Sequence, residues 1–213
     1  RLEAGETCAL VSDAGMPAIS DPGEMLVAQC AGKGIPVTVV PGPSAVVSAL
    51  AVSGLPTGRF AFEGFLSVNR KSRKERLEEL KGERRTMVFY EAPHKLAATL
   101  SDLLRVLGNR RTAVVREMTK IHEEVIRTTL SEAAKRYADG GAKGEFVLVV
   151  EGAPKPEPRK VPLGDAVELA RRYREEGMSV SEAAKRSSAE TGVRKSEIYR
   201  GVVSARIQGE QDG

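Results

Sequence analysis

Residues 7–24 read Thr7-Cys8-Ala9-Leu10-Val11-Ser12-Asp13-Ala14-Gly15-Met16-Pro17-Ala18-Ile19-Ser20-Asp21-Pro22-Gly23-Glu24. The first five residues form a short apolar run of the kind that makes a buried strand. Asp21 followed by Pro22 predicts the cap and first turn of a helix that ends at Gly32. A strand, a loop rich in Gly, Pro, Ser and Asp, and a helix thus follow one another, which is typical of an α/β fold.

The same alternation continues along the chain. Buried parallel strands are predicted at Pro36–Val40, Thr86–Tyr90, Thr112–Arg116 and Phe146–Glu151, with an edge or antiparallel strand at Glu123–Leu130. Helices are predicted at Ser44–Val52 and Pro93–Leu107, and after the capping box Thr129-x-x-Glu132. Pro154, Pro156 and Pro158 indicate a stiff linker, and helical spacing with a second capping box at Ser179 predicts a helical tail beyond it.

Composition narrows the class of protein. Of 213 residues, 41% are hydrophobic and 29% are charged, which is the balance of a globular protein, and no apolar stretch approaches the roughly 18 residues of a membrane span. Cys8 and Cys30 lie in apolar segments without metal-ligand spacing, so they are expected to be reduced core residues of a cytoplasmic protein. A disulfide scaffold, a zinc module and an aromatic single-strand platform are therefore not indicated.

Charge is unevenly distributed. Residues 1–58 carry two Lys/Arg and five Asp/Glu, whereas residues 59–85 carry nine Lys/Arg and five Asp/Glu. The basic run fits either a solvated helix face or a surface that meets phosphates.

Loops that follow the predicted strands are the candidates for binding, because ligands of open α/β sheets sit at the carboxyl ends of strands. The first loop, residues 12–23, offers Asp13 and Asp21, although Asp21 is equally suited to capping. The second loop, residues 41–45, places backbone N–H groups at a helix start, where they suit an anionic or polar group. A charged cluster at residues 116–124 follows another strand and could be functional or simply solvated.

Taken together, these segments resemble one family. The resemblance is carried by residues 11–23, by Pro41-Gly42-Pro43-Ser44-Ala45, by Phe60-x-Phe62-x-Gly64-Phe65-Leu66, by Tyr90-Glu91-Ala92-Pro93-His94, by residues 117–124 and by Lys143-Gly144-Glu145. In this order and spacing they are similar to the RsmI family of ribosomal RNA small-subunit methyltransferases, within the tetrapyrrole methylase superfamily. Met16 stands where that family usually has Thr, and Ser67 where it usually has Pro.

The resemblance implies a two-domain α/β fold of the tetrapyrrole methylase type. Residues 1–54 would be the remainder of an N-terminal cofactor-binding domain, incomplete because the family's first strand and Gly-Asn-Leu loop are not in this sequence. Residues 55–152 would form the second α/β domain, residues 153–162 the Pro-rich linker, and residues 163–213 a helical appendage.

The resemblance also implies S-adenosylmethionine as cofactor. The acceptor would be the ribose 2′-hydroxyl of cytidine 1402 in 16S rRNA of the small ribosomal subunit, the enzyme being a cytoplasmic homodimer with no metal and no membrane partner. Carried over position by position, the cofactor contacts would be Gly15, Met16, Pro17, Ser20, Ser44, Ala45, Tyr90, Glu91, Gly144 and Glu145.

A ribose hydroxyl is a poor nucleophile at neutral pH, so methyl transfer needs alignment and a base. Asp13 and Glu123 are the candidates for that base. Lys120 is the candidate cation that lowers the pKa of the hydroxyl or holds a neighbouring phosphate.

Two other functions compete with this interpretation. A methylase acting on a porphyrin-like macrocycle would need an apolar trough and no basic run. A non-enzymatic DNA-binding protein would use the tail, where Ser179–Ser188 and Lys195–Val203 flank Gly192 as in a helix-turn-helix. From residue 151 on, however, the chain has 12 Lys/Arg and 11 Asp/Glu, so the tail is less basic than a DNA-binding domain usually is.

Overall fold

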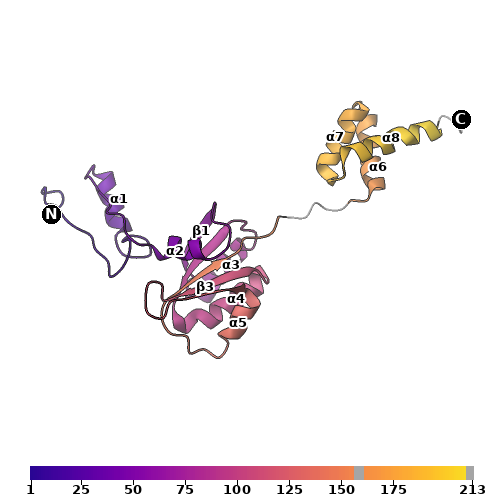
Figure 1. Cartoon of the computed structure of the whole chain (residues 1–213). Coiled ribbons are helices and arrows are strands. Elements are labelled where there is room, and N and C mark those ends of the chain that lie inside the picture. The colour runs from indigo at the N-terminus through magenta and orange to yellow at the C-terminus, as the bar shows by residue number, and fades with distance from the viewer. Residues whose placement is uncertain (156–160, 210–213) are drawn as a thin grey trace. The chain divides into compact units, whose positions relative to one another are not determined.

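The computed structural model describes residues 1–155 and 161–209, and it divides into two compact units, Arg1–Pro154 and Lys155–Gly213. Figure 1 shows the elements of both. Within the described residues, every helix is too short or too polar to span a membrane.

A mixed five-stranded sheet forms the centre of the first unit. Its strands are β1 (Phe60–Phe65), β2 (Thr86–Glu91), β3 (Arg111–Arg116), β4 (Glu124–Thr129) and β5 (Phe146–Val150), in the order β1-β2-β5-β3-β4. The helices of this unit are α1 (Glu24–Gly32), α2 (Ala45–Val52), α3 (Arg70–Leu80), η1 (Pro93–Lys95), α4 (Leu96–Leu107) and α5 (Leu130–Arg136).

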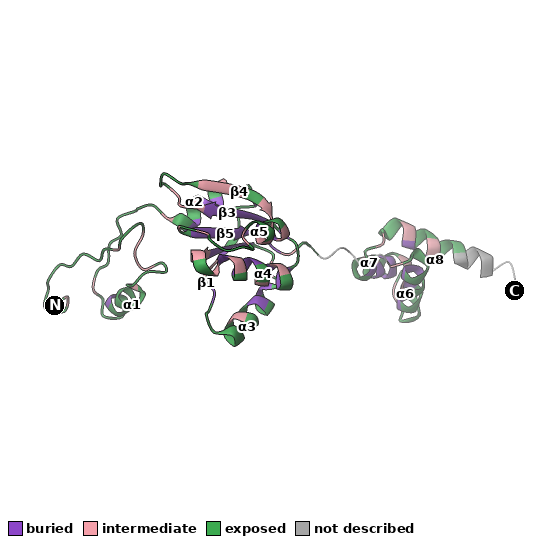
Figure 2. Cartoon of the chain, turned by 90° about the horizontal axis from the view of Figure 1, so that it is seen from below, coloured by how far each residue is buried: buried purple, intermediate pink, exposed green. Residues whose placement is uncertain are grey.

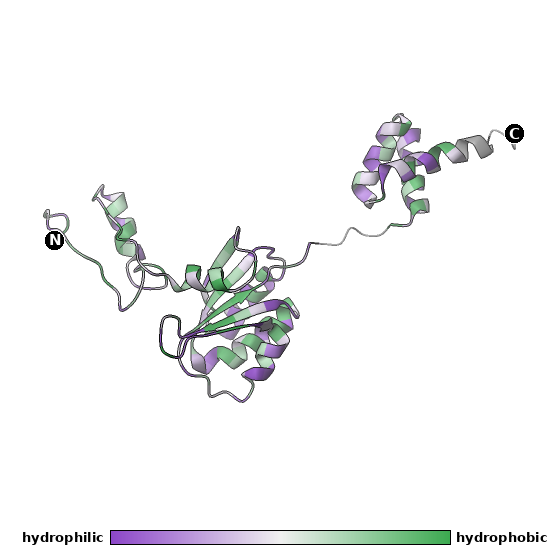
Figure 3. Cartoon of the chain, in the orientation of Figure 1, coloured by the Kyte–Doolittle hydropathy of each residue, from purple (hydrophilic) through white to green (hydrophobic). Residues whose placement is uncertain are grey.

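Alternation along the strands builds a core on each face of the sheet. Met87 and Phe89 of β2 point to one face with Leu148 of β5, and they pack against α3, α4 and α5. Val88 and Val149 point to the other face, where α2 covers them. Successive strand residues face opposite sides, so a fully apolar strand such as β5 fills both cores at once. Figure 3 shows this concentration of hydrophobic residues along the strands.

The sheet confirms the α/β class but corrects the expected strand directions. β1 and β2 are parallel, whereas β5 runs antiparallel to β2 and to β3, and β3 runs antiparallel to β4. The prediction of an edge or antiparallel strand at Glu123–Leu130 is confirmed by β4. The prediction that all the others are parallel was wrong, because β5 inserts between β2 and β3 in the opposite direction.

Two predicted strands do not form. Residues 7–11 and 36–40 are extended chain without ladder partners among the described residues, and Val11 and Val40 are 81% and 85% exposed. A strand is stabilised by its neighbours, so an apolar run without a pairing partner stays outside a sheet. Of residues 1–45, Cys30 alone is buried, as the mostly green N-terminal segment of Figure 2 shows.

Helix termini mostly follow the predicted signals. Thr129 caps α5 through the N–H of Glu132, and α4 ends at Gly108 with a positive φ of 81°. The exception is α1, whose N-cap is Gly23 and not Asp21, so the Asp21 carboxylate is not used for capping.

The second unit contains α6 (Leu163–Glu175), α7 (Val180–Thr191) and α8 (Lys195–Gly209), as predicted for a helical tail. Ala170, Ala184 and Ile198, one from each helix, are fully buried in a core of their own. The capping box predicted at Ser179 is confirmed, and α7 ends at Gly192 in the left-handed conformation. Residues 156–160 of the predicted linker and residues 210–213 of the tail lie outside the described residues.

Candidate active site

One edge of the sheet gathers most of the predicted site. β1, β2 and β3 run in the same direction, so their carboxyl ends meet the amino ends of β4 and β5 there. The register confirms the meeting, because Phe146 is opposite both Glu91 and Arg116, and Glu124 is opposite Arg116. The segments after Tyr90, after Arg116 and before Phe146 therefore lie side by side.

The first and second loops are joined by backbone contacts. The Met16 N–H donates to the Pro43 carbonyl at 3.1 Å. Gly15 has a φ of +74°, and a Cβ on it would lie 2.9 Å from that same carbonyl oxygen. A side chain at position 15 would strain the backbone and push the loops apart, so glycine is required for this approach.

Tyr90 connects the second loop to the sheet edge. Its ring lies 5.0 Å from the ring of Phe62 and 5.6 Å from that of Phe65, in edge-on and tilted arrangements. Burial raises the pKa of its hydroxyl, the nearby Val46 N–H at the start of α2 lowers it, and the charge of Asp21 raises it. Ser44 and Ala45, the residues before Val46, are thereby placed beside Tyr90.

Two serines of the first loop lie close against other parts of the protein. Ser20 Oγ lies 3.7 Å from the position a Cβ would take on Gly64 of β1, so the loop approaches the sheet edge there. Ser12 Oγ is buried and has no hydrogen-bond partner among the described residues. A buried hydroxyl without a partner is costly, and a bound polar group would relieve that cost.

A three-residue cluster of Glu117, Lys120 and Glu145, called the latch below, fixes the segment after β3. Lys120 Nζ donates to Glu117 Oε1 at 3.0 Å and to Glu145 Oε2 at 2.9 Å. Glu117 and Glu145 also exchange two bonds: the Glu145 N–H donates to Glu117 Oε1 at 2.8 Å, and the Glu117 N–H donates to the Glu145 carbonyl at 3.0 Å. The latch thus holds residues 117–120 against residues 144–145.

Electrostatics keep Glu117 and Lys120 ionised. The Glu145 N–H, and then Lys120, lower the pKa of Glu117. Hydrogen bonds from Lys120 to Glu145 and to Glu117 raise the pKa of Lys120. Lys120 therefore remains a cation at neutral pH and cannot serve as a general base there, while about half of its side chain stays open to solvent.

Unusual backbone conformations concentrate in the same loops. Among the described residues, four other than glycine have positive φ: Ala18, Ser20, Glu117 and Thr119. All four belong either to the first loop or to the segment after β3. Such conformations cost free energy and persist where the surrounding contacts impose them, which is characteristic of binding and catalytic sites.

The predicted site residues differ in their hydrogen bonds and exposure. The Glu123 carboxylate accepts from the Thr119 N–H at 2.6 Å, beside the latch. The Asp13 side chain is exposed and makes no hydrogen bond to another described residue. Buried Glu91 accepts from its neighbour Ala92 N–H and from the Thr99 hydroxyl of α4, so its carboxylate holds the start of that helix. The roles of these residues, and those of Gly15, Met16, Pro17, Ser44, Ala45, Tyr90 and Gly144, remain predictions.

The basic run at residues 59–85 separates into two kinds of cation. Arg73, Arg76 and Arg85 form ion pairs with Asp102, Glu63 and Glu83 respectively. The other six cations form no ion pair with a described residue and are exposed: Arg59, Arg70, Lys71, Lys74, Lys81 and Arg84. The run is therefore partly structural, with most of the free charge in and around α3.

Sequence reasoning missed several residues of the site. Ser12 and Glu117 lay inside the motifs, but neither was selected, because an unpaired hydroxyl and a positive φ are properties of the folded loop. Phe62 and Phe65 lay in the motif at residues 60–66 but were not selected, because the packing of their rings against Tyr90 arises only in the folded sheet.

Comparison with known proteins places the chain in a family. The family model described as Tetrapyrrole (Corrin/Porphyrin) Methylases matches residues 1–134. Ribosomal RNA small subunit methyltransferase I of Halalkalibacterium halodurans is 47% identical over 198 residues, covering 92% of this chain and 68% of that protein. The protein of the same name from Synechocystis is 42% identical over 201 residues, covering 94% of this chain and 72% of the relative.

A solved structure agrees on the fold. The crystal structure of the methyltransferase CobJ superposes with a TM-score of 0.54 at 21% identity, over 71% of this chain and 68% of the other. The alternative of a non-enzymatic DNA-binding protein was wrong, because the relatives at 47% and 42% identity, which cover more than nine-tenths of this chain, are named as methyltransferases. The chain belongs to the tetrapyrrole methylase family and, within it, to the ribosomal RNA small subunit methyltransferase I family.

Proposed function

We propose that this protein transfers a methyl group from S-adenosylmethionine to the ribose 2′-hydroxyl of cytidine 1402 in 16S rRNA. The observation that carries the proposal is that the segments after Tyr90, after Arg116 and before Phe146 meet at one sheet edge, where the latch holds a lysine that stays protonated. Relatives between 42% and 48% identical are named for small-subunit ribosomal RNA, which favours RNA over a macrocyclic substrate.

The residues present fit the cofactor. The buried, unpartnered Ser12 Oγ needs a polar partner, and the glycine at position 15 lets a ligand reach the backbone where the two loops meet. Ser44 and Ala45 begin α2 beside Tyr90, where helix N–H groups favour a polar or anionic part of a ligand. When bound, S-adenosylmethionine supplies an activated methyl group on a sulfonium.

Lys120 would act on the acceptor. Its positive charge stabilises the oxyanion that develops as the ribose hydroxyl loses its proton, and the latch fixes where that charge sits. Glu117 is then a positioning residue, because it holds Lys120 without reaching the reacting atoms itself. Glu123, which is held beside the latch by the Thr119 N–H, is better placed to take the proton than Asp13, whose side chain has no described partner.

The RNA would meet the exposed cations in and around α3. Arg70, Lys71 and Lys74 lie on this helix without ion-pair partners among the described residues, so they are free to contact phosphates. Arg73 donates hydrogen bonds to Asp102 and Thr99, so it would hold α3 in place and would not contact the RNA.

The protein is further proposed to be a cytoplasmic homodimer. Residues 10–47 expose a series of apolar side chains, including Val11, Val39 and Val40, which a second copy could cover. The predicted division at residues 54–55 between a cofactor-binding and a second domain belongs to the same proposal.

Methyl transfer to purified small ribosomal subunits tests the function directly. Labelled S-adenosylmethionine should deliver one methyl group, and mass spectrometry of RNA fragments should place it on the ribose of cytidine 1402. An RNA with 2′-deoxycytidine at that position should accept no label. A methyl group on a base, or on another nucleotide, would contradict the proposal.

A further inference from the structure

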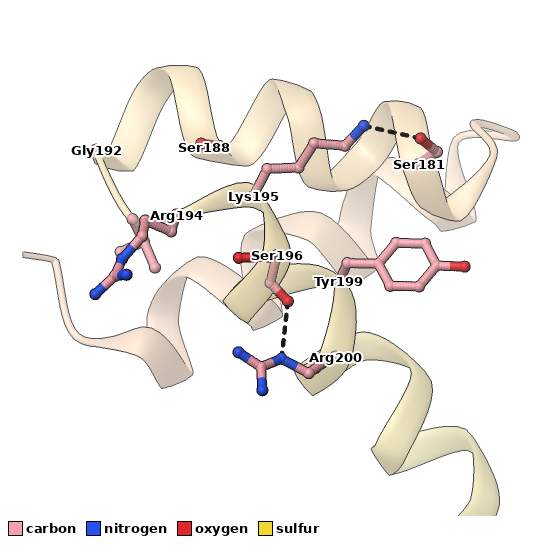
Figure 4. A pocket seen from close by; sticks show the side chains of 9 residues that line it. Ser181, Ser188, Gly192, Arg194, Lys195, Ser196, Tyr199 and Arg200 are labelled. Atoms are coloured by element: carbon pink, nitrogen blue, oxygen red, sulfur yellow. Dashed lines mark hydrogen bonds between the residues drawn. The ribbon is translucent and has the colours of Figure 1, made fainter.

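The helical unit at residues 163–209 has an open hollow of about 1050 Å³ between α7 and α8. We call it the C-terminal groove. Its lining includes Arg194 at the turn and Lys195 and Arg200 on α8, together with the hydroxyls of Ser181 and Ser196. Figure 4 shows Lys195 reaching across to Ser181 of α7, while Arg200 turns back toward Ser196 on its own helix.

The groove is positively charged. All three of its charged lining residues are cations. Arg194 lies 3.4 Å from Glu197, whereas Lys195 donates to the Ser181 hydroxyl at 3.0 Å and Arg200 to the Ser196 carbonyl at 3.3 Å. Lys195 and Arg200 therefore form no ion pair with a described carboxylate, although the unit as a whole is close to electrical balance. Arg171, Arg174 and Lys185 are also exposed and form no ion pair with a described residue, but Lys195 and Arg200 are the two unpaired cations that lie together at this hollow.

Two other cations of the unit are used differently. Arg186 lies over the ring of Tyr173 at 4.4 Å and near Glu190, and Arg172 pairs with Glu168. The charges of Arg186 and Arg172 are thus paired with groups of the three-helix unit itself. Of the groove cations, Lys195 and Arg200 contact only a hydroxyl and a carbonyl oxygen of their own unit, which a phosphate oxygen can replace with a stronger, charge-assisted bond.

We propose that the C-terminal groove binds the phosphate backbone of the substrate RNA, as a second contact that is separate from the methyl-transfer site. The inference rests on the proposed function for the identity of the polymer. Two cations and neighbouring hydroxyls recognise phosphates without reading bases, so the contact adds affinity and not sequence selectivity. Exposed Tyr199, which also lines the groove, offers a ring on which one nucleotide can pack.

Salt dependence of RNA binding tests the proposal. Binding of the whole chain to a fluorescent single-stranded RNA from the decoding region is followed by anisotropy from 0.1 to 1 M salt. Each lost phosphate contact lowers the slope of log affinity against log salt by about 0.7 for a single strand. Lys195→Ala with Arg200→Ala should therefore lower the slope by about 1.4 and weaken binding about 25-fold at 0.1 M salt, with little effect at 1 M.

A matched control separates the groove from overall charge. Arg171→Ala with Arg174→Ala removes the same charge from exposed positions on α6, away from the groove, and should leave affinity nearly unchanged. Lys195→Arg with Arg200→Lys should restore most of the affinity. An RNA of unrelated sequence should respond to the groove variant as the decoding-region RNA does.

Three results would overturn the proposal: equal binding by the groove variant and wild type, equal losses in the groove and control variants, or tighter binding to duplex DNA than to RNA. The last would show that this unit prefers a duplex to the substrate RNA. Methyl transfer and cofactor binding are measured on the same preparations. Wild-type protein that binds RNA but methylates no ribosomal RNA would contradict the proposed function and leave the groove result standing.

Discussion

Residues 1–44 and residues 60–150 supply the two sides of the proposed site, and the structure holds these two regions in place differently. In the second region, paired strands and three helices bury side chains on one face of a sheet, and the latch ties its loops with two ion pairs. In the first region Cys30 is the one buried residue, and a single backbone hydrogen bond joins the first loop to the second.

The contrast indicates a division of roles. Local stability follows buried apolar contacts, so the sheet region should resist unfolding and hold Lys120 in a fixed position. The first region can adjust around a ligand at low cost. We therefore expect changes in the sheet to alter stability or turnover, and changes in the first loop to alter cofactor affinity.

The largest expected effect is on stability. Leu148→Ala removes a fully buried side chain from the central strand β5 and should cost about 2–5 kcal/mol. Val40→Ala, in the first region, should cost under about 0.5 kcal/mol because that side chain is exposed. Urea denaturation followed by circular dichroism measures both. Similar losses for the two variants would remove the distinction between the regions.

Next in size is an effect on turnover. Lys120→Ala should lower the rate of methyl transfer at least tenfold and leave cofactor affinity near the wild-type value, because the lost charge acts on the acceptor. Lys120→Arg should recover part of the rate, and Glu117→Gln should give an intermediate loss by loosening the latch. Near-normal single-turnover methylation of assembled small subunits by the alanine variant would show that Lys120 is a solvated surface residue with no role in methyl transfer.

A smaller effect is expected on cofactor affinity. Gly15→Ala forces a side chain into a left-handed conformation, 2.9 Å from the Pro43 carbonyl, at a cost of about 1–3 kcal/mol. The first loop should shift away from the second, so calorimetry should show roughly tenfold weaker binding of S-adenosylmethionine with an unchanged unfolding midpoint. A lower midpoint with unchanged affinity would place the loop in the stable part of the fold instead.

The smallest effect is expected on the stability of the protein at acidic pH. Arg85 lowers the pKa of Glu83, next to β2, to about 2. A carboxylate whose folded-state pKa is lowered stabilises the protein above its ordinary pKa, so this contribution should be lost as pH falls from about 4.5 to about 2. The pair lies at the surface, so the loss should not exceed about 1 kcal/mol. Glu83→Gln should remove that part of the pH dependence and nothing else, and an unchanged acid profile would contradict the assignment.

Much of the sheet region could be predicted from local sequence, but pairing could not. Thr86–Tyr90 and Thr7–Val11 are both short apolar runs, yet one is a buried strand and the other is exposed chain. The difference lies in their neighbours, which a run of five residues does not encode. The direction of β5 was missed for the same reason, since its partners are about 35 to 60 residues away along the chain.

The candidate site was predicted at the level of motifs and missed at the level of contacts. The sequence placed Glu117 in a charged cluster. It did not show that the Glu117 backbone adopts a positive φ, or that a Cβ on Gly144 would lie 2.5 Å from the Glu117 side chain. Both facts arise from the meeting of two loops far apart in the sequence. The latch does not exclude the solvated alternative for this cluster, because the side chains of Lys120 and Glu145 are 49% and 85% exposed.

The strand order has a consequence for synthesis on the ribosome. β5 is the last strand to be made, yet it lies between β2 and β3 and pairs with both. The pairs β1–β2 and β3–β4 can form as they leave the exit tunnel, but the two halves have no shared ladder until residue 150 emerges. At about 5–20 residues per second, the edges of β2 and β3 would stay unpaired for several seconds, a period in which a chaperone or a wrong partner could reach them.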